Sequence, residues 1–336
     1  MILVRAPLRI SFVGGGTDLP DFYWRYPGRV LSTTINKFVY VVIKDTPLID
    51  KFTAKYQVTE TAAHPSQLVN DRIRAALLDL GIVRGGLEIG SFADLPAKTG
   101  LGSSSSFSVA LMKGLCAFLG KKLNQSEAAE LACRLELELL KEPIGKQDQY
   151  AAALGGCNVF QFNSNGTVNA EPVFLDYQKR SLLENHSLLF FTGISRAAAT
   201  VLGEQRNKID RHLETYKAMS DSVFDFKAKL LAGDVRGMAD MLYQGWEQKK
   251  SLAVNVSNST IDEFFAAGMK AGAWGGKILG AGSGGCLFFI APPRLHEQIT
   301  QSLQAVAARH NLPDARKVPF TFTQSGADVL FHEKNK

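Results

Sequence analysis

The sequence lacks the patterns that mark a secreted protein, a membrane protein or a structural metal centre. Its four cysteines are far apart, with no C-x-x-C pair among them, and its six histidines are scattered. These spacings exclude a disulfide framework and a zinc site, so we expect reduced core cysteines in a cytoplasmic protein. Arg5 and Arg9 interrupt the apolar N-terminus, and we therefore expect neither a signal peptide nor a membrane span.

An excess of one charge is also missing. The 38 Lys and Arg residues against 32 Asp and Glu residues leave a net charge of +6, with no basic run and no basic-aromatic stripe. This balance argues against a nucleic-acid partner and suits a small anionic ligand. A chain of 336 residues is longer than a single hydrophobic core usually supports. We therefore predict two domains, residues 1–182 and 183–336. The sequence indicates no oligomeric state.

The most informative stretch is the segment 96–106, Pro-Ala-Lys-Thr-Gly-Leu-Gly-Ser-Ser-Ser-Ser. Gly100 and Gly102 let the backbone turn tightly and approach a ligand, and the N–H groups at the start of the following apolar helix suit a phosphate. The segment has no Gly-Lys-Ser/Thr ending, so it is not a Walker A loop, and it lacks the third glycine of a dinucleotide fingerprint. From these residues alone it is either a phosphate-binding loop or a flexible turn that only caps the helix.

Composition and periodicity predict helices and strands along the whole chain. The predicted elements are strands near 1–13, 30–43, 86–92 and 286–290, and helices near 66–80, 107–120, 126–140 and 196–246, the last broken at Gly233. A third glycine-rich turn, at 280–285, precedes the strand 286–290. This order favours an α+β first half and a second half of the split β-α-β type.

Three acidic residues stand out by their positions. Glu136 lies on the apolar stripe of the predicted helix 126–140, so its carboxylate needs either a salt bridge to an arginine or a bound cation. Asp148 precedes an alanine-rich helix and is either an N-cap or the group that orients or deprotonates a substrate hydroxyl. Asp18, which follows three glycines and a threonine, is either a turn cap or a ligand for sugar hydroxyls.

Three glycine-rich motifs, in this order, make the chain resemble the GHMP small-molecule kinases. The middle motif of that family, Pro-x-x-x-Gly-Leu-Gly-Ser-Ser, is matched by residues 96–104. The first is matched by Ala-Pro-Leu-Arg at 6–9 with Gly-Gly-Gly-Thr-Asp at 14–18, and the third by residues 277–286. The resemblance implies an α+β protein with the two-domain GHMP kinase fold. Its N-terminal domain would be ribosomal protein S5 domain 2-like, and its C-terminal domain a ferredoxin-like split β-α-β structure.

The resemblance also implies a phosphotransferase that uses ATP and Mg²⁺ to phosphorylate an alcohol group of a sugar phosphate. Asp148 would accept or orient the proton of the sugar hydroxyl, with Arg9 beside it, and Ser104 and Glu136 would hold Mg²⁺. The residues expected at the ATP phosphates are Lys98, Gly100, Leu101, Gly102, Ser103, Ser104 and Ser105. The residues expected at the sugar are Gly15, Gly16, Thr17, Asp18, Arg196 and Gly282. Arg196 follows a glycine turn after a predicted buried strand, a place where ligand-binding loops often lie. Arg196 and Lys98 are the two candidates for binding a phosphate group on the sugar.

Within the family, the stretches 6–20 and 141–150 are similar to the D-glycero-D-manno-heptose 7-phosphate kinases. This similarity implies phosphorylation of the anomeric hydroxyl of that sugar to give the 1,7-bisphosphate. Fucokinase-type domains share much of the same sequence, so a free sugar such as L-fucose is the alternative acceptor. A regulator that binds sugar and ATP without catalysis is the alternative of another class. Galactokinases have Glu-His at the positions of Gly15 and Gly16. This difference argues against galactose as the substrate and leaves more room on that side of the expected sugar site.

Overall fold

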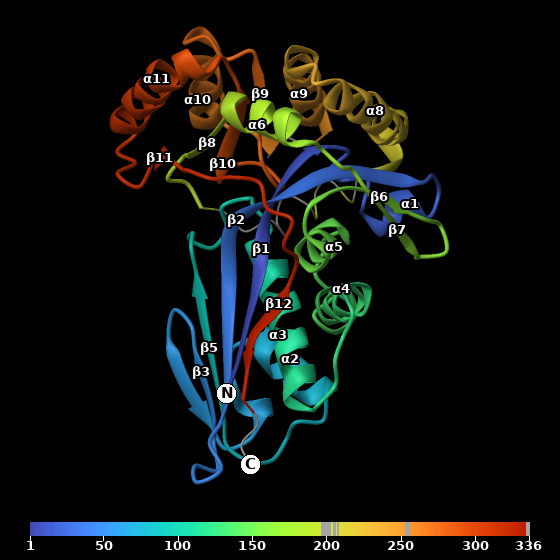
Figure 1. The fold of residues 1–336 in the computed structure, drawn as a ribbon, viewed down its shortest axis with the longest axis vertical. Helices are drawn as coiled ribbons and strands as arrows, with labels where there is room; N and C mark the ends of the chain where they lie inside the picture. Colours follow the sequence, from blue (N-terminus) through green and yellow to red (C-terminus); the bar gives the residue numbers. More distant parts are fainter. Residues whose placement is uncertain (196–202, 204–205, 207, 253–255, 334–336) are drawn as a thin grey trace.

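The computed structural model describes residues 1–195, 203, 206, 208–252 and 256–333. These residues form two β-sheets covered by helices, and Figure 1 shows the second sheet with its helices stacked on one end of the first. The predicted α+β class is therefore confirmed. Within the described ranges, no helix is both long enough and apolar enough to cross a membrane.

The first sheet is built around a long antiparallel pair, β1 (Ile2–Val13) and β2 (Gly28–Asp45). Its main strand order is β12-β1-β2-β5-β3-β4, while β6 pairs with the other half of β2 and β7 pairs with β6. The remaining strands are β3 (Phe52–Lys55), β4 (Thr59–Ala62), β5 (Leu87–Ala93), β6 (Cys157–Phe162), β7 (Val168–Pro172) and β12 (Asp328–His332). Because β1 and β2 run the length of this sheet, the residues at the inner end of β1 reach the junction between the two sheets.

A central helix, α3 (Ser103–Phe118), packs against β1 and β2 and is buried on most of its surface. A Cβ at Gly114 would lie only 2.8 Å from Ile43 Cδ1, so this glycine lets the helix approach the sheet closely. Figure 1 shows three further helices around α3, on the same face of the sheet. They are α2 (Asp71–Asp79), α4 (Gln125–Cys133) and α5 (Gln147–Leu154). Asn124 and Glu127 form a capping box at the start of α4.

The second sheet has four antiparallel strands in the order β11-β8-β10-β9. Numbered from its own first strand this order is 4-1-3-2, with the crossover helices expected of a split β-α-β unit. The strands are β8 (Ser187–Phe191), β9 (Gly275–Ile278), β10 (Cys286–Ile290) and β11 (Arg316–Lys317). The helices of this half are α8 (Leu213–Ala232), α9 (Val235–Leu252), α10 (Ser259–Lys270) and α11 (His296–Arg309).

Both faces of the second sheet are buried, which explains why β8 and β10 are apolar without alternation. Leu189 and Phe288 face α8, α9 and the end of β1, whereas Phe190 and Phe289 face α10 and α11. The first of these two cores contains residues from both sheets and so fixes one sheet against the other. The predicted break at Gly233 is confirmed, because this residue ends α8 in the left-handed region with φ +75°.

The end of the chain returns to the first sheet. After β11, Phe322 forms an isolated antiparallel bridge with Ile35 of β2. The chain then continues into β12, which pairs antiparallel with β1. The division of the chain at residue 182 stays a prediction. It falls inside α6 (Tyr177–His186), and the final strand does not lie with the other strands of residues 183–336. Sequence order could not predict this return, because strand pairing over more than 300 residues leaves no local signal.

Candidate active site

The loop before α3 has the geometry of an anion site. Gly102 occupies the N-cap position of α3 with φ +78°, and no side chain caps the helix. The four serines that follow Gly102 lie inside the first turn of the helix, and the Ser106 hydroxyl donates to the Pro7 carbonyl oxygen. A helix start with uncapped N–H groups and a positive dipole end fits a phosphate without rearrangement.

The three glycine-rich segments meet at this loop. Cys286 N donates to Thr99 O at 2.9 Å, and a Cβ at Gly100 would lie 2.5 Å from Leu279 O, so the middle and third motifs touch backbone to backbone. The first motif joins them through Arg9, whose backbone N donates to Leu101 O at 3.0 Å. The close approach of Gly100 to Leu279 O leaves no room for a Cβ, which accounts for a glycine at this position.

Arg9 and Asp148 form a bidentate ion pair beside the loop. Arg9 Nε donates to Asp148 Oδ1 at 2.8 Å and Nη2 donates to Oδ2 at 2.9 Å, while Nη1 donates to Gly100 O at 2.8 Å. The guanidinium is buried, but the Asp148 side chain keeps 24% of its surface exposed. The N-cap position of α5 belongs to Lys146, so the alternative that Asp148 caps this helix is wrong. The pair therefore offers an oriented carboxylate next to the loop that precedes α3.

Asp18 links the first motif to the segment that carries Asp148. Its carboxylate accepts hydrogen bonds from Gly16 N at 3.0 Å and from Gln147 N at 3.2 Å. Burial, with a smaller contribution from the charge of Asp148, raises the pKa of Asp18 above its usual value. Both carboxylate oxygens accept bonds from the protein, so Asp18 holds this turn together, and its contact with sugar hydroxyls stays a prediction.

The neighbouring residues of the first motif divide into two kinds. The Thr17 hydroxyl is buried and donates to Gly14 O and Arg29 O, each at 2.8 Å, so it holds the turn together. Gly15 lines an open cavity described below. The sequence could not tell which residue of this motif holds the turn and which lines the cavity, because both lie within the same five positions.

Glu136 is fully buried and held by hydrogen bonds from several elements. It accepts from the Ser105 and Ser108 hydroxyls at 2.8 Å each and from Gln149 Nε2 at 2.5 Å, while the guanidinium of Arg72 lies 3.5 Å away. The salt bridge to an arginine, one of the two alternatives for this carboxylate, is therefore present, although Arg72 lies closer to Glu142. Glu136 sits in a π-helical turn, η2 (Arg134–Leu139), that interrupts the predicted helix. Such turns recur at functional sites.

Other predicted residues are placed as follows. Lys98 is exposed with φ +64° at the start of the loop, and the Leu101 side chain is buried in the core between the sheets. Ser104 is exposed on the first turn of α3, beside Ser105. Gly282 has φ +112° and packs against the carbonyl of Val256. Arg196 lies outside the described residues.

Two buried lysines near this centre were missed by the sequence reasoning. Lys249 Nζ donates to Gly280 O at 2.6 Å, and Lys277 Nζ donates to Ser11 O at 3.0 Å and Phe12 O at 2.9 Å. Burial lowers the pKa of Lys249 to about 8, helped by the charge of Arg9 and opposed by Asp18 and Asp148. Burial likewise lowers the pKa of Lys277 well below its usual value, as do the charges of Lys249 and Arg9. A signal existed, since Lys249 lies on the buried stripe of α9 that includes Leu242 and Trp246.

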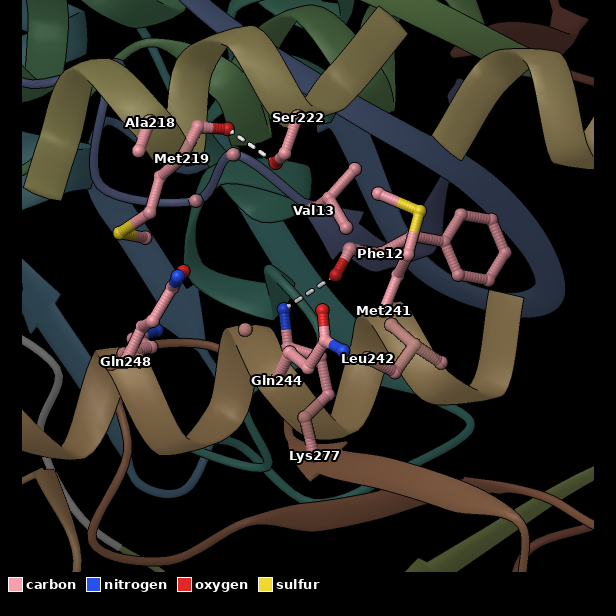
Figure 2. A pocket seen from close by; sticks show the side chains of 14 residues that line it. Phe12, Val13, Ala218, Met219, Ser222, Met241, Leu242, Gln244, Gln248 and Lys277 are labelled. Atoms are coloured by element: carbon pink, nitrogen blue, oxygen red, sulfur yellow. Dashed lines mark hydrogen bonds between the residues drawn. The ribbon is translucent and has the colours of Figure 1, made fainter. Parts of the chain in front are cut away.

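Both lysines line a cavity of about 100 Å³ at the inner end of β1. Figure 2 shows it between α8, which contributes Ala218, Met219 and Ser222, and α9, which contributes Met241, Leu242, Gln244 and Gln248. The remaining wall is the backbone of Gly14 and Gly15 with Phe12 and Val13. The described residues include no group of three or more His, Cys, Asp or Glu side chains that could hold a metal ion by themselves.

Comparison with known proteins agrees with this geometry. The family model for the GHMP kinases N terminal domain matches residues 67–156, and that for the GHMP kinases C terminal matches residues 226–309. Together they cover just over half of the chain. The chain is also 29% identical to a D-glycero-alpha-D-manno-heptose 7-phosphate kinase of Campylobacter jejuni, over 90% of this chain and 93% of that protein.

Two further similarities bear on the substrate class. An L-fucokinase/L-fucose-1-P guanylyltransferase of Bacteroides fragilis is 24% identical over 97% of this chain, which spans 38% of that longer protein. The crystal structure of a D-glycero-D-manno-heptose 1-phosphate kinase from Bacteroides thetaiotaomicron superposes with a TM-score of 0.81 and 28% identity, covering 99% of this chain and 100% of that one. The predicted two-domain fold is thereby confirmed. The chain belongs to the GHMP kinase family, and it is a sugar kinase that transfers a phosphoryl group from ATP to an alcohol group.

Proposed function

We propose that the chain phosphorylates the anomeric hydroxyl of D-glycero-D-manno-heptose 7-phosphate with ATP, giving the 1,7-bisphosphate and ADP. One observation carries the chemistry. The Arg9–Asp148 ion pair lies against Gly100 O at the loop that precedes α3, so a carboxylate and a phosphate site adjoin. The heptose phosphate kinases among the similar proteins support the choice of acceptor. The four described cysteines are unpaired and buried, which supports the cytoplasmic location that we propose.

In this proposal the backbone N–H groups at the start of α3 bind the ATP phosphates, and Ser103, Ser104 and Ser105 surround them. Asp148 Oδ2 is the carboxylate oxygen closest to the loop, since a Cβ at Gly102 would lie 3.3 Å from it. We assign to this oxygen the proton of the anomeric hydroxyl, which is more acidic than an ordinary alcohol and needs only a modest base. Arg9 orients the carboxylate and stabilises the negative charge that develops between donor and acceptor.

The residues present fit a magnesium ion in part. The exposed Ser104 hydroxyl at the start of α3 is an available oxygen ligand, and Mg²⁺ in kinases is bound largely by phosphates and water with one or two protein ligands. The Glu136 oxygens accept bonds from three close donors, two on Oε2 and one on Oε1, so Oε1 is the oxygen that can take a further ligand. Bound Mg²⁺ would neutralise charge on the transferring phosphoryl group. We propose Ser104 and Glu136 as its protein partners.

A coupled ADP-release assay tests the acceptor directly. The panel is heptose 7-phosphate, heptose 1-phosphate, free heptose, mannose and L-fucose, and we expect the highest kcat/KM with heptose 7-phosphate. A higher value with heptose 1-phosphate would move the reacting hydroxyl to another carbon and overturn the anomeric assignment. A preference for L-fucose would make the chain a fucokinase instead.

A further inference from the structure

The cavity at the inner end of β1 has no part in the transfer step described above. Its volume of about 100 Å³ is several times the roughly 10–15 Å³ that a single water molecule needs. Among its described lining residues are no Asp or Glu and no residue of the loop 96–106. The cavity therefore differs both in charge and in position from the proposed ATP site.

The polar groups on its walls suit a compact anion. Lys249 supplies an ammonium group, and Gln244 and Gln248 supply neutral donors, while Lys277 Nζ and the Ser222 hydroxyl already donate to backbone carbonyls. Lys249 uses one of its three N–H donors on Gly280 O and makes no other hydrogen bond to a described residue. Burying a cation without a contacting carboxylate is unfavourable, and a phosphate in the cavity would offset this cost. The lowered pKa of Lys249, about 8, reports the same desolvation.

The cavity is also in reach of the reacting centre. A Cβ at Gly15 would lie 3.5 Å from Ser11 Oγ and 3.9 Å from Gln147 Nε2, and Ser11 donates to Gln147 at 3.0 Å. Gln147 precedes Asp148, so Gly15 lies between the cavity that it lines and the segment that carries this carboxylate. The same wall has no side chain of its own, because Gly15 and Gly14 supply only backbone there.

We infer that this cavity binds the phosphate group already present on the sugar acceptor, and that Lys249 is the residue that recognises it. The inference rests on the proposed function, since it requires a phosphorylated acceptor. The sugar extends from Asp148, at its reacting hydroxyl, past Gly15 to Lys249, at its phosphate. Lys277 donates to the carbonyl groups of Ser11 and Phe12 and so fixes the end of β1 behind the site. Lys249 is thus a specificity-determining residue, whereas Lys277 is a positioning residue.

The test compares Lys249→Met with Lys250→Met, a matched change at the next position. Lys250 pairs with Glu247 and does not line the cavity. For Lys249→Met we expect the KM for heptose 7-phosphate to rise by about 10- to 100-fold, the value of a lost charged hydrogen bond. The KM values for ATP and for free heptose should stay within about twofold, and Lys250→Met should behave as wild type.

The outcomes separate this inference from the proposed function. If the wild type prefers the phosphorylated sugar and Lys249→Met keeps that preference, the inference is wrong and the proposed function stands. If the KM for ATP rises instead, Lys249 serves the donor phosphates, and the inference is again wrong. If the wild type does not prefer the phosphorylated sugar, both fail. Should Lys249→Met not fold, as judged by circular dichroism, the exposed Gln248→Glu decides, because a carboxylate on the wall should raise the same KM selectively.

Discussion

Replacing Glu136 with Gln separates a metal-binding role from a structural one. The wild-type carboxylate accepts three short hydrogen bonds, from Ser105, Ser108 and Gln149. Bonds to a charged acceptor contribute about 1.5–3 kcal/mol and bonds to a neutral one about 0.5–1.5 kcal/mol, so neutralisation weakens each by about 1 kcal/mol. Part of this loss is offset because no charge is then buried. We expect Glu136→Gln to fold and to lose about 2 kcal/mol of unfolding free energy in urea.

The activity assay then decides the role. If Glu136 acts on Mg²⁺ as proposed, kcat should fall by about 100-fold or more, and the Mg²⁺ concentration for half-maximal rate should rise. Glu138→Gln is the matched control, since Glu138 is exposed on the same π-helical turn and both quantities should stay unchanged. A Glu136→Gln enzyme with lowered stability but wild-type kcat and Mg²⁺ dependence would refute the metal role and leave Glu136 as a structural residue only.

Three further predictions follow from the same site. Asp148→Asn should lower kcat by about 100-fold or more, because the amide cannot take the hydroxyl proton. Unchanged turnover with heptose 7-phosphate would remove Asp148 from the mechanism. A wild-type protein that binds sugar and ATP without turnover would be a regulator. Lys249 has a pKa of about 8 and is charged below that value, so the KM for the phosphorylated sugar should rise as the pH increases through 8, with no matching rise for free heptose; parallel profiles would contradict the assignment. Gly100→Ala places a Cβ 2.5 Å from Leu279 O at a backbone φ of +80°, so we expect a loss of stability of about 2 kcal/mol or more and a higher KM for ATP, measured by urea unfolding and by kinetics, whereas a wild-type stability would show that the loop can move away from the third motif.

Features with a local cause could be predicted from the sequence. The glycine-rich loop, the capping box of Asn124 and Glu127 and the break at Gly233 depend on residues a few positions apart, and the structure has all three. The apolar-stripe argument also worked for Glu136, whose side chain is fully buried. In each case a short stretch of chain carries both the residue type and the reason for it.

Features with a distant cause could not be predicted. The carboxylate of Glu136 is held by Arg72 and Gln149, on helices before and after its own, and no spacing in the sequence connects the three. Lys249 lies on the apolar stripe of α9, but its partner, the Gly280 carbonyl, is 31 residues away in the sequence, and no spacing connects the two. The π-helical turn at Glu136 replaces a regular helix without a glycine or proline to mark it. These placements come from tertiary packing, which overrides local preference.

The return of β12 to β1 has a consequence for how the protein is made. Glu333 N donates to Met1 O, so the first and last described residues of the chain are hydrogen-bonded neighbours, and Figure 1 shows both ends at the tip farthest from the second sheet. While the chain leaves the ribosome, β1 keeps one edge unpaired until β12, more than 300 residues later, has been synthesised. The strand that carries Arg9 therefore receives this partner long after its own synthesis, and a chain cut before β12 would expose that edge to other chains.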